Sequence, residues 1–390
     1  MLHREVFEMK YNENDFFEIV KKYDDKNVSD EEIIQLIHAL ANSGEVMKFS
    51  GCVYDFASTG GPSSLSTLLV PLYLHGLGVN VINLAVPGRP AGAVDVLAQI
   101  GGYDLDRFDN MSKEPFYIHL VANDKFVPMD KALFEYRKKV NKVNVSNLAI
   151  ASILSKKVAS GAKRIGLDIR VSEFGNFGSN WETCRDNAIK YNRLAKRLGI
   201  ESLCFLSDAN IPYQRYIGRG ESLEALYDIF MGTADEQLME HVKYCEYIAK
   251  CLVTKEKEKV RFITKEVDLT MLFKKNLEAQ GTEYNQFLHA VERVKEQPHI
   301  IIRADRDGYI QYNLKNIREF IVARQKGERE MLRYPDRCGI KLLCNAGEYV
   351  SMEEPIISIR SVENVDMNEV KSLFLINNNK MNNAVRREVI

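Results

Sequence analysis

Hydrophobic and polar positions alternate at helical spacing in the first 50 residues and again over residues 145–162. Ser29 and Glu32 form a capping-box pattern ahead of the run IIQLIHALANSG, which predicts a helix beginning near residue 30. The segment VSNLAIASILSKKVASGA predicts another helix, with Ser146 as its N-cap and Gly161 at its end.

The middle of the chain shows a different pattern, in which short apolar runs alternate with amphipathic stretches. Buried strands are predicted over residues 79–86 and 163–171 and within FYIHLVAND and ESLCFLSDANI, and NWETCRDNAIKYNRLAKRLGI predicts a long helix. This alternation favours an α/β fold with a mainly parallel sheet. After about residue 300, short strands separated by turns indicate a further α+β unit.

Composition narrows the class of protein. The chain has 390 residues, 45% of them hydrophobic and 27% charged, and a net charge of -1. Such a length allows two or three packed units, and the balanced charge predicts no nucleic-acid partner. The N-terminus is too polar for a signal peptide, and no apolar run approaches the roughly 18 residues that span a bilayer. Seven irregularly spaced cysteines without a CxxC predict free thiols in a reducing cytoplasm and no metal site.

The stretch YDFASTGGPSSLSTLL, from Tyr54 to Leu69, combines paired glycines, hydroxyl side chains and a following helix, but it contains no lysine or arginine. Glycines before a helix start expose backbone N–H groups, and the helix dipole adds partial positive charge. The pattern therefore predicts either a phosphate-binding loop without a cation or a strand-to-helix turn capped by serine or threonine.

A second constellation lies on the helix predicted over residues 145–162. Ser152 and Lys156 are four residues apart and therefore share a face, and Arg137 precedes this helix. Two cations and a hydroxyl suit a planar, acceptor-rich ligand such as a pyrimidine, and they would stabilise negative charge on a departing base. The alternative is that Lys156 and Lys157 only flank a helix end.

At these residues the chain resembles the thymidine and pyrimidine-nucleoside phosphorylases, which share their fold with anthranilate phosphoribosyltransferase. The matching stretches are D-x-x-STGG (Asp55 to Gly61), the GR and G-x-x-D motifs (Gly88 to Asp95), ASILSKKVASGA (151–162), LDIRV (167–171), SDAN (207–210) and GEYVSMEEPI (347–356).

The resemblance implies a pyrimidine nucleoside or base as ligand and no cofactor other than phosphate as a possible co-substrate. It implies that Arg137, Ser152 and Lys156 bind the base, with Lys156 and Arg137 taking up charge on it. It also implies that the phosphate or sugar is held by a second set of residues, namely Ser58, Thr59, Gly60, Gly61, Thr67 and Arg89.

The resemblance further implies a small helical domain beside a larger α/β domain, with a C-terminal α+β subdomain. The helical domain would combine residues 1–52 with 137–162 and would form a homodimer. The α/β domain would combine residues 53–136 with 163–300, and residues 301–390 would form the C-terminal subdomain.

Departures from the family pattern concentrate in the phosphate half of the site. Phe56 and Ala57 replace a lysine and a histidine, and Pro87 replaces a serine. Residues 62–65 replace the usual V-G-D-K, Ala93 replaces a hydroxyl residue, and residues 172–177 replace a glycine-rich segment. A lost charge-assisted contact costs roughly 1.5–3 kcal/mol, so several losses together should weaken phosphate binding by orders of magnitude.

Three hypotheses follow from these departures. The protein is a pyrimidine-nucleoside phosphorylase with a rebuilt phosphate site, a hydrolase of the same N-glycosidic bond, or a nucleoside-binding protein without activity. In the hydrolase, Asp55 or Glu173 would act as general base towards water, although Asp55 could simply accept a backbone N–H. We expect chemistry at the N-glycosidic bond of a pyrimidine nucleoside, with Lys156, Arg137 and Asp55 as catalytic residues.

Overall fold

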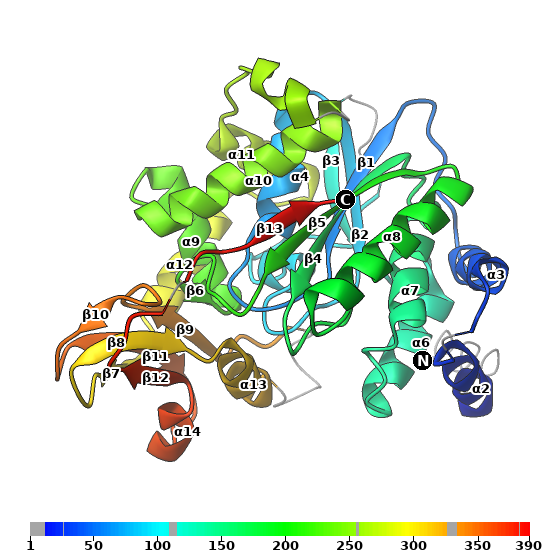
Figure 1. Ribbon diagram of the computed structural model, residues 1–390. Helices are drawn as coiled ribbons and strands as arrows, with labels where there is room; N and C mark the ends of the chain where they lie inside the picture. The colour runs from blue at the N-terminus through cyan, green and yellow to red at the C-terminus, as the bar shows by residue number, and fades with distance from the viewer. Residues whose placement is uncertain (1–11, 26, 109–114, 255–256, 326–333, 382) are drawn as a thin grey trace.

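A six-stranded sheet forms the centre of the computed structural model, which describes residues 12–25, 27–108, 115–254, 257–325, 334–381 and 383–390 (Figure 1). Most of the polar N-terminal stretch lies outside the described residues. The strand order is β13-β5-β4-β1-β2-β3. The strands are β1 (Val53–Ser58), β2 (Asn80–Ala85), β3 (Tyr117–Val121), β4 (Arg164–Val171), β5 (Glu201–Asp208) and β13 (Arg387–Val389).

The first five strands pair in parallel, and only β13 runs antiparallel, beside β5. The predicted α/β class with a mainly parallel sheet is therefore confirmed. These strands are rich in branched apolar residues because helices cover both faces of a parallel sheet. The predicted strands over 79–86 and 163–171 correspond to β2 and β4.

One face of the sheet packs against a group of helices from the α/β part of the chain. These are α4 (Ser66–Gly76), α5 (Ala93–Leu97), α9 (Arg219–Met231), α10 (Glu236–Thr254), α11 (Leu269–Ala279) and α12 (Tyr284–Lys295), with the 3₁₀ turn η1 (Lys257–Phe262) after α10. Figure 1 shows α10 and α11 side by side with α4 on this face.

The opposite face carries α8 (Trp181–Arg197) and a helical layer made of α2 (Glu13–Tyr23), α3 (Asp30–Ala41), α6 (Pro128–Lys139) and α7 (Ser146–Ala159). The layer packs through a shared apolar core with β4 and β5. The predicted capping box at the start of α3 is confirmed, because Ser29 accepts the backbone N–H of Glu32, whose carboxylate accepts that of Ser29.

The predicted N-cap of α7 is wrong. Val145 occupies the N-cap position, and Ser146 is already the first helical residue. The Ser146 hydroxyl instead accepts a hydrogen bond from Nδ2 of Asn187 on α8, 3.1 Å away, and so links the two helices. The end of α7 follows the prediction, since Gly161 has a φ of +68° directly after the C-cap Ser160.

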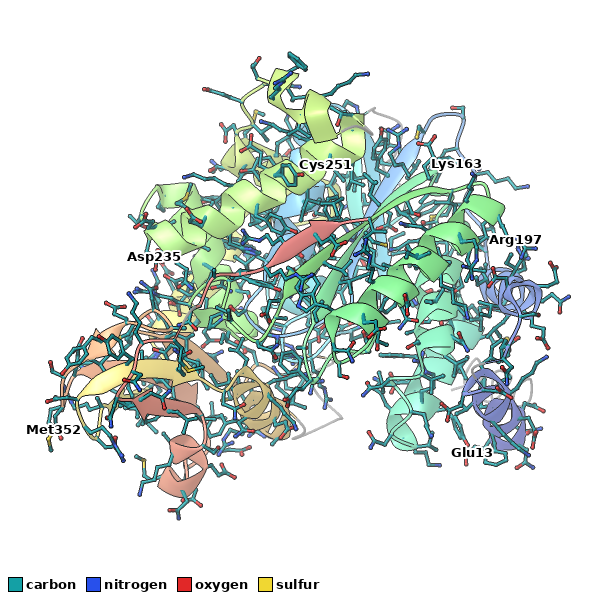
Figure 2. All side chains as sticks on the ribbon, viewed as in Figure 1. Glu13, Lys163, Arg197, Asp235, Cys251 and Met352 are labelled. Carbon is teal, nitrogen blue, oxygen red and sulfur yellow. The ribbon has the colours of Figure 1, made fainter. Side chains whose placement is uncertain are left out.

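The C-terminal part forms two small antiparallel sheets, ordered β10-β8-β12 and β6-β9-β11-β7, with α13 (Leu314–Arg324) and α14 (Met367–Lys371). The strands are β6 (Tyr216–Ile217), β7 (His299–Arg303), β8 (Gly308–Tyr312), β9 (Cys338–Leu342), β10 (Tyr349–Val350), β11 (Pro355–Ser361) and β12 (Phe374–Asn377). Figure 2 shows Met352 of this part and Glu13 of the helical layer on opposite sides of the molecule.

Strand pairing crosses the expected boundary at residue 301 in both directions. β6 precedes that boundary but pairs with β9, whereas β13 follows it and pairs with β5 of the central sheet. Strands of two or three residues are too short to show an alternating pattern, so the sequence could not assign them.

Two composition-based expectations can be compared with the structure. All seven cysteines lie in the described part of the chain and are free thiols. Within the described ranges, none of the helices combines the length and apolar composition of a bilayer-spanning segment.

Candidate functional site

A cavity of about 180 Å³ lies at the carboxyl ends of β1, β2 and β4. The chain continues from β1 to β2 and β3 on one side, and β4 and β5 lie on the other. This is the topological switch point at which ligands bind in open α/β sheets. Every site residue proposed from the sequence except Asp55 and Glu173 lines this cavity, namely Ser58, Thr59, Gly60, Gly61, Thr67, Arg89, Arg137, Ser152 and Lys156.

The loop after β1 is held to its neighbours by a few hydrogen bonds. The backbone N–H of Thr59 donates to the carbonyl of Asp168 (2.9 Å), and the Thr59 hydroxyl accepts from the backbone N–H of Arg170 (3.0 Å). Gly60 and Gly61 have φ values of +84° and +132°, which only glycine adopts readily. The loop therefore brings the N-terminus of α4, including Thr67, to the cavity.

On the opposite wall, the Lys156 ammonium uses all three of its N–H donors within the protein. It donates to Oδ2 of Asp130 (2.6 Å), to Oγ of Ser152 (2.9 Å) and to the carbonyl of Ser152 (2.5 Å). Burial lowers the pKa of Lys156, and the nearby Asp130 carboxylate opposes that shift. A ligand oxygen that reaches Lys156 must therefore replace one of these partners.

Arg137, at the end of α6, donates several of its N–H groups to backbone carbonyls. Its guanidinium donates to the carbonyls of Lys142 (3.2 Å), Val143 (2.6 Å) and Leu148 (3.4 Å), which fixes the segment before α7. Since a guanidinium has five N–H donors, two remain for a ligand in the cavity. Burial lowers the pKa of Arg137 to about 10, against the opposing charge of Asp130, so the side chain stays cationic at neutral pH.

Apolar side chains separate these polar groups. Phe134, Val143 and Ile153 line the cavity together with Ser152 and Lys156. A flat heterocycle with polar edges fits such a mixture of apolar walls and few donors.

Sequence reasoning missed Asp130, the partner of Lys156. Its side chain is 1% exposed, and its Oδ1 has no hydrogen-bond partner among the described residues. Asp130 lies seven positions before Arg137 on α6, which is about two helical turns and places both side chains on one face. This seven-residue spacing from Arg137 could have identified Asp130 as a site residue from the sequence.

Asp55 lies outside the cavity lining. Its buried carboxylate accepts from Lys157 Nζ (2.7 Å) and from the backbone N–H of Phe56 (2.6 Å). Burial raises the pKa of Asp55 to about 6, with Lys157 opposing the shift. Glu173 is exposed and also absent from the lining. Neither carboxylate is placed to deprotonate a water molecule in the cavity, which corrects the general-base prediction.

The described lining of the cavity contains five cationic side chains and no carboxylate, the cations being Arg89, Arg137, Lys156, Lys157 and Arg170. The partner carboxylates of Lys156, Lys157 and Arg170 are Asp130, Asp55 and Asp168, and all three lie outside the lining. The described lining therefore presents N–H donors and no carboxylate oxygen, which favours an acceptor-rich or anionic ligand.

Arg89 lies on the turn after β2, and a buried carboxylate anchors that turn. Oδ2 of Asp95 accepts the backbone N–H of Gly88 (2.6 Å), and its Oδ1 accepts from Arg219 (2.6 Å) on α9. The turn that carries Arg89 to the cavity is thus tied to the helices on one face of the sheet.

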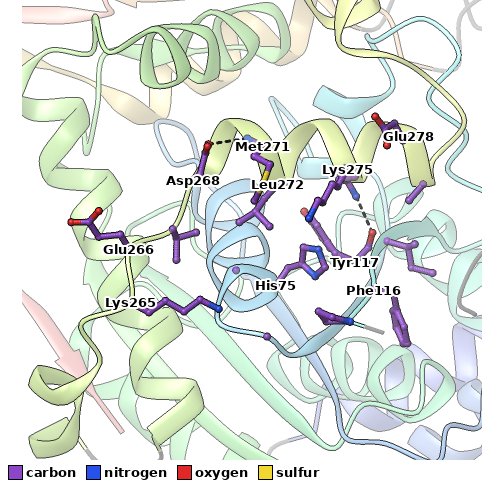
Figure 3. A pocket seen from close by; sticks show the side chains of 17 residues that line it. His75, Phe116, Tyr117, Lys265, Glu266, Asp268, Met271, Leu272, Lys275 and Glu278 are labelled. Atoms are coloured by element: carbon purple, nitrogen blue, oxygen red, sulfur yellow. Dashed lines mark hydrogen bonds between the residues drawn. The ribbon is translucent and has the colours of Figure 1, made fainter. Parts of the chain in front are cut away.

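A larger cavity of about 630 Å³ lies elsewhere, beside β3, the end of α4 and α11 (Figure 3). Its lining mixes basic and acidic side chains, among them His75, Lys265, Glu266, Lys275 and Glu278. None of the site residues proposed from the sequence contributes to it. The cavity at the switch point is therefore the candidate functional site.

The amino-acid sequence of this chain is similar to those of several curated proteins. No protein-family profile matches the chain. Over 231 residues it is 30% identical to the pyrimidine-nucleoside phosphorylases of Staphylococcus haemolyticus and Bacillus subtilis, a stretch that covers 56% of this chain and 52% of each relative. The chain thus spans about half the length of the curated relatives it matches.

Two solved structures are similar at low sequence identity. The anthranilate phosphoribosyltransferase of Thermus thermophilus has a TM-score of 0.44 and 13% identity over 72% of this chain and 95% of its own. The enzyme of Saccharomyces cerevisiae has a TM-score of 0.43 and 11% identity over 68% and 80%. The curated relatives confirm that this chain resembles the pyrimidine-nucleoside phosphorylases, as its motifs indicated.

Proposed function

We propose that this protein transfers the pentosyl group of a pyrimidine nucleoside to phosphate. The observation that carries the proposal is a single cavity in which Arg137, Ser152 and Lys156 lie together with the STGG loop. The likeness to pyrimidine-nucleoside phosphorylases supports the same reaction.

In the proposed reaction the pyrimidine lies between the apolar side chains of α6 and α7. Its carbonyl oxygens accept hydrogen bonds from Lys156, Ser152 and the remaining donors of Arg137. The bond between the base nitrogen and C1′ breaks, its electron pair passes to the base, and the two cations stabilise the resulting negative charge. A phosphate oxygen forms the new bond to C1′, which yields pentose 1-phosphate and the base anion. The base anion becomes free base by taking up the proton that the phosphate group carried.

The cavity chemistry favours phosphate over water as the nucleophile. Hydrolysis calls for a general base within hydrogen-bond reach of the attacking water. The described lining supplies no carboxylate for this role, whereas its cations suit a phosphate dianion, which attacks without prior deprotonation.

Phosphate dependence of base release tests the proposal. Uridine, thymidine, deoxyuridine and cytidine are each incubated with the protein, with and without inorganic phosphate, and free base is quantified by chromatography. We expect base and pentose 1-phosphate only when phosphate is present. Equal base release with free pentose in phosphate-free buffer would indicate hydrolysis, and binding without any turnover would indicate a nucleoside-binding protein.

A further inference from the structure

We propose that Arg170 of β4 supplies the cation of the phosphate subsite, in place of the lysine that is missing from β1. The inference rests on the proposed function, because it names the residue that holds the co-substrate of that reaction. It assigns Arg170 a direct contact with a phosphate oxyanion in the cavity.

The Arg170 guanidinium is buried but incompletely paired. The residue is 2% exposed and lines the cavity. Its Nε donates to Oδ2 of Asp168 (2.8 Å) and its Nη2 to Oγ of Ser66 (3.1 Å). Its Nη1 has no hydrogen-bond partner among the described residues. A charged donor buried in this way calls for a polar partner, and a ligand oxygen at the cavity would supply one.

Hydrogen bonds to β4 and to the first residue of α4 hold this guanidinium in place. The Ser66 hydroxyl donates to the same Asp168 oxygen (2.7 Å), so strand, helix and guanidinium form one hydrogen-bonded unit. A Cβ added to Gly61 would lie 3.4 Å from the Phe174 ring and 3.8 Å from Cγ of Arg170, so the loop backbone passes close to the arginine stem. These hydrogen bonds fix the orientation of the Arg170 guanidinium.

Backbone donors line the same cavity. The N–H of Gly61 makes no hydrogen bond in the described structure. At the start of the 11-residue helix α4, the N–H of Ser66 donates to Oγ of Ser64 (3.2 Å), and the N–H of Thr67 makes no hydrogen bond in the described structure. A helix N-terminus, a free loop N–H and a guanidinium together form the usual elements of a phosphate site, and arginine pairs with phosphate through parallel N–H donors. The anion would thus be held from β4 and α4 instead of from β1.

Substitution of Arg170 tests the inference through phosphate binding itself. Isothermal titration measures the Kd of inorganic phosphate for the nucleoside-free protein, and steady-state kinetics measure the KM for phosphate and for nucleoside. We expect Arg170→Met to raise the Kd and KM for phosphate about 10- to 100-fold while the KM for nucleoside stays within about twofold. Arg164→Met is the matched control, because Arg164 lies on the same strand but pairs with Glu201 outside the cavity.

Arg170→Lys keeps a donor for Asp168 and covers the case in which Arg170→Met fails to fold. For this variant we expect phosphate binding to weaken about tenfold, because a single Nζ cannot reproduce the separate Nε and Nη positions from which the guanidinium meets Asp168, Ser66 and the anion. Unchanged phosphate Kd and KM in either folded variant would overturn the inference, as would a wild-type protein that binds no phosphate. If the wild type binds phosphate and Arg170→Met does not, the phosphate subsite is supported even when no nucleoside is cleaved. Phosphate binding therefore tests the subsite, and nucleoside cleavage tests the proposed reaction.

Discussion

Lys156→Met is expected to lower kcat for nucleoside cleavage about 10²- to 10³-fold at saturating phosphate. The Lys156 ammonium is the buried cation nearest the Ser152 hydroxyl, and it would meet the charge that develops on the departing base. Removal of one such preorganised donor typically costs this factor, because the charge grows in a site shielded from water. Base release followed by ultraviolet absorbance gives kcat directly.

Stability must be separated from catalysis in this experiment. Lys156→Met leaves the Asp130 carboxylate buried without its cation, which should reduce the free energy of unfolding by about 3–5 kcal/mol. The double variant Lys156→Met/Asp130→Leu removes both charges and should regain much of that stability without regaining turnover. Lys131→Met on α6, which breaks only an exposed ion pair with Asp124, is the control for turnover. Near-normal kcat in folded Lys156→Met would remove Lys156 from the catalytic site.

Lys157→Met is expected to reduce the free energy of unfolding by about 3–5 kcal/mol at pH 7, because it strands the buried Asp55 carboxylate. Burial already raises the pKa of Asp55 to about 6, and loss of Lys157 raises that pKa further. A protein with an acid whose pKa is higher in the folded state than in the unfolded chain loses stability as the pH rises from the unfolded pKa to the folded pKa, and loses no more above the folded pKa. Wild type and variant differ in bound protons only above the wild-type pKa of about 6, so the deficit of the variant should shrink on acidification from pH 7 to about pH 6, by up to about 1.4 kcal/mol, and then level off.

Chemical denaturation of wild type and variant at several pH values measures this deficit. Lys131→Met again serves as the control, since its exposed pair with Asp124 should contribute no more than about 1 kcal/mol. Lys157→Met/Asp55→Leu should be more stable than Lys157→Met at pH 7. A deficit in Lys157→Met that is small or independent of pH would contradict a buried ion pair between β1 and α7.

Local spacing explains which parts of the site could be predicted. Ser152 and Lys156 share a face because they are four residues apart on one helix, and their side chains do line one cavity. Glycines before a helix start predicted the loop of Gly60 and Gly61, whose positive φ values fit that expectation. These features depend on neighbours in sequence, so periodicity and turn chemistry are sufficient to find them.

Contacts between distant segments explain what could not be predicted. Arg170 lies in an apolar segment that predicts a buried strand. The parallel pairing of β4 with β1 brings it to Thr59, which is 111 residues earlier in the chain. The two-residue spacing of Asp168 and Arg170 places both on one face of the strand, but that pattern does not reveal which element covers the face. Asp55 was predicted to be catalytic because it is an acidic residue next to a loop motif. In the structure its carboxylate is instead buried and paired with Lys157 of α7.

A crystal structure of the protein soaked with uracil and phosphate tests the central claim most directly. We predict the heterocycle among Phe134, Ile153 and Ser152, with a carbonyl oxygen about 2.7–3.2 Å from Nζ of Lys156. We predict the phosphate at Gly61, beside Nη1 of Arg170. A heterocycle bound elsewhere, with the side chains of Arg137, Ser152 and Lys156 turned away from it, would contradict the account.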